Sequence, residues 1–191
     1  MEAADEIAMK HKRRINIGFL IGMLLATTIF VSCGKDDDAQ AKKAQERLSK
    51  QIENGNVSNL SLTIYYLSPF YYTFAPLDVD ELIGGYYEHK MVVDGNMLEE
   101  YIDLLNQISS IELIPVENES YIDARIYYVF EARNNRKIFD VAMWGDEWNV
   151  YVNGVEVKET DIFYDVIMPF LPEDAVSTLE TVLGRGYQET V

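Results

Sequence analysis

The sequence predicts an α+β domain, in which an antiparallel sheet has helices packed on one face. Three short turn sequences divide residues 124–158 into four segments of alternating apolar residues, which indicates a four-stranded meander. Outside the meander, apolar residues recur at helical spacing over residues 97–108 and about 160–170. Strands that are grouped together, with helices before and after them, are typical of an α+β fold.

The meander has turns at Asn134-Asn135, Gly145-Asp146 and Asn153-Gly154. If each loop has two residues, the strand register follows from the turns. The predicted pairs across the first turn are Phe130 with Phe139, Tyr128 with Val141 and Ile126 with Met143. Across the second they are Met143 with Trp148, Val141 with Val150 and Phe139 with Val152, and across the third Val152 with Val155 and Val150 with Val157. All three turns place apolar side chains on one common face.

The remaining elements are predicted from shorter patterns. Asp78 or Asp80 is expected to cap a helical turn through Leu82, which Gly84 and Gly85 end. Other expected elements are strands at 60–67 and 86–93, a short strand at 111–115 and a final helix at 173–183.

The first residues have the organisation of a secretory signal. A basic block, KHKRR at residues 10–14, precedes an uncharged run from Ile15 to Val31, and the small residue Ser32 follows. The strongly apolar part has 15 residues, whereas a membrane-spanning helix needs about 20. A cleaved signal is therefore predicted over residues 1–32, with Met9 as an alternative start, and an uncleaved anchor helix is the other interpretation.

The sequence FVSC at the end of this run resembles the lipobox of bacterial lipoproteins, with Phe30 in place of the usual Leu. The resemblance implies cleavage before Cys33 and attachment of diacylglycerol to its sulfur. Several acyl chains bind a membrane far more firmly than one chain. The domain would then be lipid-anchored to the cell membrane or outer membrane, outside the cytoplasm. The sequence CGKDDD also resembles a cell-surface export tag, although a solvated acidic spacer is favoured.

Charge divides the rest of the chain into two parts. Residues 33–58 carry balanced charges and few apolar residues, so they are predicted to be the anchor cysteine and a polar tether. Residues 59–191 form the single predicted domain, and they carry an excess of 17 negative charges. Such a surface repels phosphate backbones, so nucleic acid is an unexpected partner. One cysteine and two histidines give no basis for a disulfide framework, a metal site or a cofactor.

The second face of the meander is the candidate binding surface. It would present Arg125, Tyr127, Val129, Trp144 and Tyr151. Among these, Arg, Tyr and Trp are residue types that are frequent at binding hot spots. Arg125 is expected opposite Trp144 as a cation–π pair. The alternative, which is slightly favoured, is that the first strand or the loop at 68–76 covers this face. That loop, SPFYYTFAP, is itself expected to be buried.

No catalytic constellation stands out. Asp78, Asp80 and Glu81, and Glu99 with Asp103, are interpreted as a solvated acidic surface, and His89 as structural. The leading hypothesis is a non-enzymatic, membrane-anchored binding module for an unidentified protein, peptide or glycan. The alternatives are a hydrolase of cell-envelope or exogenous polymers that uses unidentified carboxylates, and an inhibitor or immunity-type lipoprotein with an acidic binding surface.

Overall fold

The computed structural model describes residues 33–117, 120–144 and 148–184. The predicted signal segment and the turn at Gly145-Asp146 lie outside the described residues. One compact unit begins at Asp38, and the architecture below is that of this unit.

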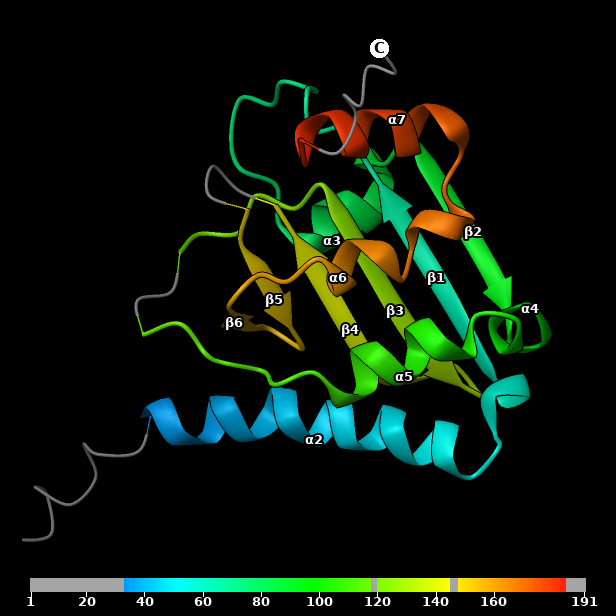
Figure 1. Ribbon diagram of the computed structural model, residues 1–191. Coiled ribbons are helices and arrows are strands. Elements are labelled where there is room, and N and C mark those ends of the chain that lie inside the picture. Colours follow the sequence, from blue (N-terminus) through cyan, green and yellow to red (C-terminus); the bar gives the residue numbers. More distant parts are fainter. Residues whose placement is uncertain (1–32, 118–119, 145–147, 185–191) are drawn as a thin grey trace, which may run out of the picture. The chain divides into compact units, whose positions relative to one another are not determined.

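The centre of the unit is one antiparallel sheet (Figure 1). Its strands are β1 (Leu60–Tyr66), β2 (His89–Asp94), β3 (Ile126–Ala132), β4 (Arg136–Met143), β5 (Val150–Val152) and β6 (Val155–Val157). Their order is β2-β1-β3-β4-β5-β6, so the predicted meander forms one side of the sheet. β1 lies beside β3 and not over its face, because the two strands are paired along their length.

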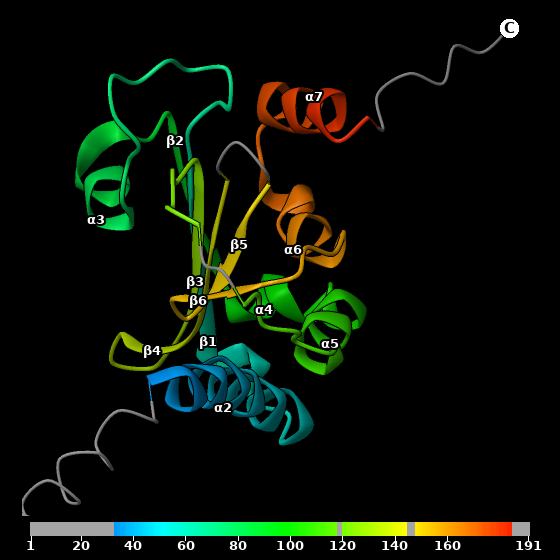
Figure 2. The same ribbon diagram turned by 90° about the vertical axis from the view of Figure 1, so that its left-hand side faces the viewer.

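Helices cover one face of the sheet, as the sequence predicts (Figure 2). They are α4 (Gly95–Glu99), α5 (Ile102–Ser110), α6 (Ile162–Asp165) and α7 (Glu173–Val182). α2 (Cys33–Glu53) lies across one end of the sheet, and all five helices contribute to the main core. The short α3 (Val79–Glu81) lies on the opposite face (Figure 2). It continues into a π-helical turn over Leu82–Tyr86. The α+β fold class is confirmed.

Several predicted elements differ in their bounds. β2 begins three residues later than expected. The helix predicted at 97–108 is divided into α4 and α5 at Tyr101, whose φ of −113° and ψ of 29° are not helical. The helix predicted at 160–170 consists of α6 and a 3₁₀ turn at Met168–Phe170. The strand predicted at 111–115 is wrong, because Pro115 makes only an isolated bridge to Val157.

The first turn of the meander has three residues instead of two. Ala132 pairs with Arg136, and a bulge between Phe130 and Glu131 restores the predicted pairing of Phe130 with Phe139. Ile138 is the extra residue of this bulge. Regular alternation from Phe139 would place Ile138 on the second face, but its side chain belongs to the main core beside Phe139. The pairs Tyr128–Val141 and Ile126–Met143 are confirmed.

The register across the second turn is wrong by two residues. Val141 pairs with Val152, and Met143 pairs with Val150. A shift of two residues keeps every side chain on its predicted face, since strand side chains alternate with a period of two. The third turn is confirmed, with Val152 opposite Val155.

The predicted polar tether is wrong from residue 38 onward. Ala41, Ala44 and Leu48 of α2 are almost completely buried in the main core. The side-chain amide of Gln45 donates to the backbone carbonyls of Ile108 and Ile111, at 3.1 and 2.8 Å. The second half of the segment is therefore a structural helix of the domain.

The two edges of the sheet differ. At β6, the Val116 N–H donates to the Glu156 carbonyl at 3.1 Å, and the Lys158 N–H donates to the Ile114 carbonyl at 2.8 Å. These bonds cover the outer edge of β6 with the segment that follows α5. The strand at the other edge is β2, where Lys90 and Val92 are exposed.

Replacing Leu48 with Ala tests whether α2 belongs to the core. The side chain is fully buried, so the substitution leaves a cavity and is expected to lower the free energy of unfolding by about 2–5 kcal/mol. Urea unfolding of the full chain measures the change. Arg47→Ala, at the exposed neighbour, is the control and should change stability by less than about 0.5 kcal/mol. Equal small effects of both substitutions would contradict this role of α2.

Candidate functional site

The second face of the sheet is covered over much of its area. Tyr127, Val129 and Tyr151 are only 8%, 8% and 7% exposed, and Arg125 is 5% exposed. They lie in or beside a second, smaller core that includes Leu67, Leu77 and Leu82. The open docking surface is therefore wrong, and the favoured alternative, that this face is covered, is confirmed. The cover comes from the α3 turn and from the segments that flank the loop at 68–76.

The aromatic loop, residues 69–76, is the main exposed apolar feature of this region. Phe70, Tyr71, Tyr72 and Phe74 are 71%, 51%, 83% and 101% exposed. The expectation that this loop is buried is wrong. It lies at the end of the sheet where β1 finishes, and α2 lies at the opposite end (Figures 1 and 2).

Arg125, in a partly buried ion pair with Asp123, attaches the middle of the aromatic loop to the start of β3. One guanidinium N–H of Arg125 donates to Asp123, and Nη2 donates to the Thr73 hydroxyl at 3.0 Å. The same Asp123 oxygen accepts from the Leu77 N–H at 2.9 Å. The loop is thus held at its centre and at its end, so its aromatic side chains are displayed on a positioned backbone.

The aromatic loop and the sheet enclose a hollow of about 340 Å³, which Asp123, Arg125 and Trp144 also line. Arg125 Nε is buried without a hydrogen-bond partner among the described residues. Trp144 has a φ of 111°, a conformation that bulky residues rarely adopt and that is enriched at functional sites. Arg125 and Trp144, two predicted site residues, both line this hollow, and Trp144 also packs against the main core. Arg125 uses its guanidinium for hydrogen bonds to Asp123 and Thr73.

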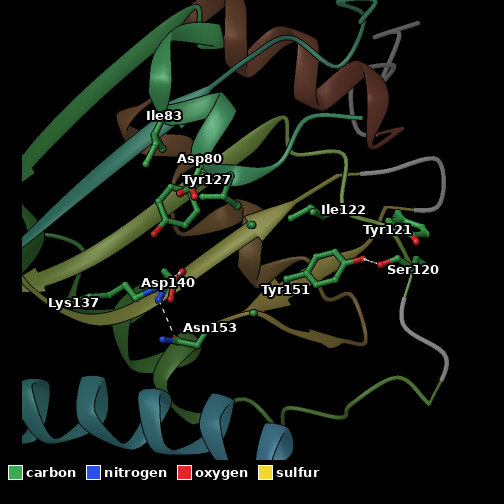
Figure 3. Close-up of a pocket in the computed structure, with 13 residues that line it drawn as sticks. Asp80, Ile83, Ser120, Tyr121, Ile122, Tyr127, Lys137, Asp140, Tyr151 and Asn153 are labelled. Atoms are coloured by element: carbon green, nitrogen blue, oxygen red, sulfur yellow. Dashed lines mark hydrogen bonds and ion pairs between the residues drawn. The ribbon is translucent and has the colours of Figure 1, made fainter. Parts of the chain in front are cut away.

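A larger cleft of about 560 Å³ lies between the α3 turn and the meander (Figure 3). Its floor is formed by Tyr127, Ala142 and Tyr151, which are paired neighbours on β3, β4 and β5. Val79, Asp80 and Ile83 line it from the α3 turn, and residues 120–122 line it from the segment before β3. Tyr127 and Tyr151, predicted for one open surface, are instead brought together in this cleft, whereas Val129 lines neither cavity.

Asp140 is the buried charge of the cleft. Its backbone N–H donates to the Asn153 side-chain oxygen at 3.1 Å, and its carbonyl accepts from the Asn153 N–H at 2.9 Å. The carboxylate Oδ2 lies 3.2 Å from Lys137 Nζ. The other oxygen, Oδ1, is buried, and the phenol of the neighbouring Tyr127 donates a hydrogen bond to the Asp140 carboxylate. In the sequence, this residue is an Asp between apolar residues of a strand, on the second face of the meander. The sequence alone assigns it no function.

The charge of Asp140 also affects Tyr127. Burial of the phenol and, secondarily, the nearby Asp140 carboxylate raise the pKa of Tyr127 well above its ordinary value. Both effects disfavour a second negative charge in the cleft. Tyr127 therefore stays a neutral phenol, and Asp140 is the buried acid of the cleft floor.

The other polar residues of this region form contacts that stabilise the fold. The Asp78 carboxylate accepts from the Glu81 N–H at 2.7 Å, and the Glu81 carboxylate accepts from the Asp78 N–H at 3.0 Å, which forms a capping box for α3. His89 contacts Asp174 of α7 at 3.3 Å. Glu156 is buried, but its two oxygens accept from Ser120 and Asn149.

Comparison of the chain with known protein families, with curated proteins and with solved structures found no match. Within the described residues, none of the helices combines the length and apolar character required to cross a bilayer.

The buried phenols predict a loss of stability at alkaline pH. The pKa of Tyr66 is raised to about 12 by burial, and that of Tyr127 is also raised. Unfolded phenols ionise near pH 10, so above about pH 10 the unfolded state binds fewer protons and the free energy of unfolding falls. Tyr127→Phe should reduce this fall by at most about 1.4 kcal/mol per pH unit.

Urea unfolding between pH 8 and pH 11 measures this difference. Tyr72→Phe is the control, because the Tyr72 side chain is exposed in the folded protein and meets solvent in both states. If the free energy of unfolding fell equally steeply with pH in wild type and in Tyr127→Phe, Tyr127 would make no contribution to the alkaline loss of stability.

Proposed function

We propose that this protein is a lipid-anchored, extracytoplasmic binding protein that uses the aromatic loop to dock a partner protein. The observation that carries the proposal is the display of Phe70, Tyr71, Tyr72 and Phe74 on a backbone that Arg125 and its partner Asp123 hold in place. Exposed apolar patches on soluble domains often mark interaction sites, and aromatic residues contribute much of the energy at such sites.

The sequence around Cys33 supports the location. The basic block, the apolar run and FVSC have the order that a bacterial lipoprotein signal requires. Only four residues separate Cys33 from the compact unit that begins at Asp38. An anchor at Cys33 would hold the N-terminal side of the domain near the membrane, and the aromatic loop lies at the end of the sheet away from α2 (Figure 1). This arrangement favours a partner outside the membrane over insertion of the loop into lipid.

A partner protein is favoured over a glycan or a short peptide by the kind of surface. The aromatic side chains project from the loop, and Phe74 is fully exposed. Projecting aromatic side chains are suited to enter pockets on a partner. The acidic surface adds a charge that would attract a basic partner and repel nucleic acid.

Radiolabelled palmitate tests the anchor. The wild-type chain should incorporate label and fractionate with membranes, whereas Cys33→Ser should do neither, because Cys33 is the only thiol of the chain. Ser49→Ala, at a residue of α2 that the lipid does not involve, is the control and should retain the label. Label in Cys33→Ser, or an unlabelled wild-type chain, would contradict the lipid anchor.

A photoreactive phenylalanine analogue at position 72 tests the docking surface in intact cells. We expect one discrete protein adduct from position 72 and none from position 97, where Met97 is 49% exposed on α4. The adduct should weaken by at least about tenfold when Phe70 and Phe74 are replaced by Ser, since hot-spot side chains contribute about 2 kcal/mol or more each. Absence of an adduct, or equal adducts from both positions, would overturn the proposed surface, and a protease-resistant adduct would overturn the choice of a protein partner.

A further inference from the structure

We propose that the domain docks on an anionic phospholipid membrane through a basic surface at the end of the sheet where α2 lies. The basic surface is formed by five cationic residues, Lys43, Arg47 and Lys50 of α2 and Arg133 and Arg136 at the turn between β3 and β4. This contact rests on the lipid anchor proposed above, to which it adds a second attachment. It would fix which side of the domain faces the bilayer.

The cations of the basic surface are available to a partner. All five residues are exposed, and none of them forms an ion pair with another residue that the structure describes. Two other cations differ, because Arg125 is paired with Asp123 and Lys137 with Asp140. A Lys or Arg near an anionic membrane strengthens binding about fivefold, which corresponds to about 1 kcal/mol.

The charges of α2 are unevenly distributed around the helix. The Gln40 side chain donates to the Asn153 carbonyl at 3.0 Å, and the Gln45 side chain donates to a backbone carbonyl of α5 at 3.1 Å. These two contacts mark the side of α2 next to the meander and the side next to α5. Successive residues of a helix are rotated by about 100°. The three cations therefore lie nearer to the Gln40 side, whereas Glu46 and Glu53 lie nearer to the Gln45 side.

The two arginines of the basic surface lie at the same end of the sheet as α2. β1 begins at Leu60, shortly after α2 ends at Glu53, and Leu60 pairs with Ala132, the last residue of β3. The β3–β4 turn is therefore at the end of the sheet that α2 crosses, as Figures 1 and 2 show. This turn belongs to the meander, on whose side the cations of α2 lie. Two segments that are distant in sequence thus contribute to one basic surface.

The acidic charge of the domain does not prevent docking at this end. Residues 59–191 carry an excess of 17 negative charges, which an anionic membrane repels. At physiological ionic strength the Debye length is about 8 Å, so charges further than this from the bilayer are largely screened. Cations that touch the headgroups therefore dominate the interaction, and the acidic remainder of the surface disfavours other orientations.

The place of Cys33 favours a membrane over an acidic protein as the partner of the basic surface. Cys33 precedes Asp38, the first residue of the compact unit, by five residues. Since an extended residue spans at most about 3.6 Å, a lipid on Cys33 would hold Asp38 within about 18 Å of the bilayer. α2 continues from Asp38, so the basic surface follows directly, whereas the aromatic loop lies at the other end of the sheet (Figure 1).

Alanine methyl resonances test this contact in the full chain. The labelled chain is reconstituted through its own anchor into lipid nanodiscs with a gadolinium-chelating lipid, in phosphatidylcholine alone or in a mixture with phosphatidylglycerol. Ala132 lies beside the basic surface, and Ala75 belongs to the aromatic loop. Gadolinium should broaden Ala132 strongly in the anionic discs and weakly in the neutral discs, because an anchored but undocked domain is free to rotate. Ala75 should be broadened in neither.

Matched double substitutions test the cations. Lys43→Gln with Lys50→Gln removes two charges of the basic surface and should lower the ratio of docked to undocked domain at least about tenfold. Lys90→Gln with Lys158→Gln makes the same chemical change at exposed residues outside this surface and should leave the broadening of Ala132 unchanged. Sodium chloride at about 1 M, where the Debye length is about 3 Å, should abolish the broadening while the anchor keeps the chain in the disc.

Mass spectrometry of the same sample separates failure of the anchor from failure of the basic surface. If Cys33 carries lipid, equal broadening of Ala132 in neutral and anionic discs, or in the two double variants, would overturn the basic surface and leave the anchor intact. A chain without lipid on Cys33 would contradict the anchor and the orientation that depends on it. Soluble hexaglutamate and glycerol 3-phosphate represent an acidic protein and a free headgroup. A shift of the Ala132 resonance with either of them, but not with anionic discs, would overturn the choice of a membrane.

Discussion

The constraint on which the rest of the structure depends is the burial of β3 and β4 on both of their faces. Tyr128, Phe139 and Val141 face the main core, and Tyr127 and Ala142 face the smaller one. Helices cover the first face, whereas the described segments over the second face are the α3 turn and irregular segments. The cleft beside Tyr127 and Tyr151 lies on that second side.

Much of the fold could be predicted because the alternation of side chains along a strand is unchanged by a register error of two residues. The second turn of the meander was placed two residues from its true register, yet the assignment of Val141 and Val150 to the main core was correct. The bulge at Ile138 is different, because a bulge changes the face of a single residue without changing the sequence pattern around it.

α2 and the candidate site were harder to predict because neither leaves a strong pattern in the local sequence. The buried stripe of α2 is made of Ala41, Ala44 and Leu48, and two small side chains in a charged segment produce a weak apolar signal. The exposure of the aromatic loop depends on Arg125 and Asp123, which hold it from the neighbouring segment. Such contacts between residues distant in sequence leave no local pattern. The pairing of Asp140 with Tyr127 and Lys137 likewise appears only once these neighbours are placed.

The two edges of the sheet have different consequences for contacts between copies of the protein. The strip from Ile114 to Val116 occupies the hydrogen-bonding groups beside β6, so among the described residues β2 is the edge that can extend the sheet into another molecule. β2 carries Lys90 and Asp94, and charged side chains on an edge oppose strand addition by a second copy. Two copies that meet at this edge would thus remain separate, and each would keep its own sheet.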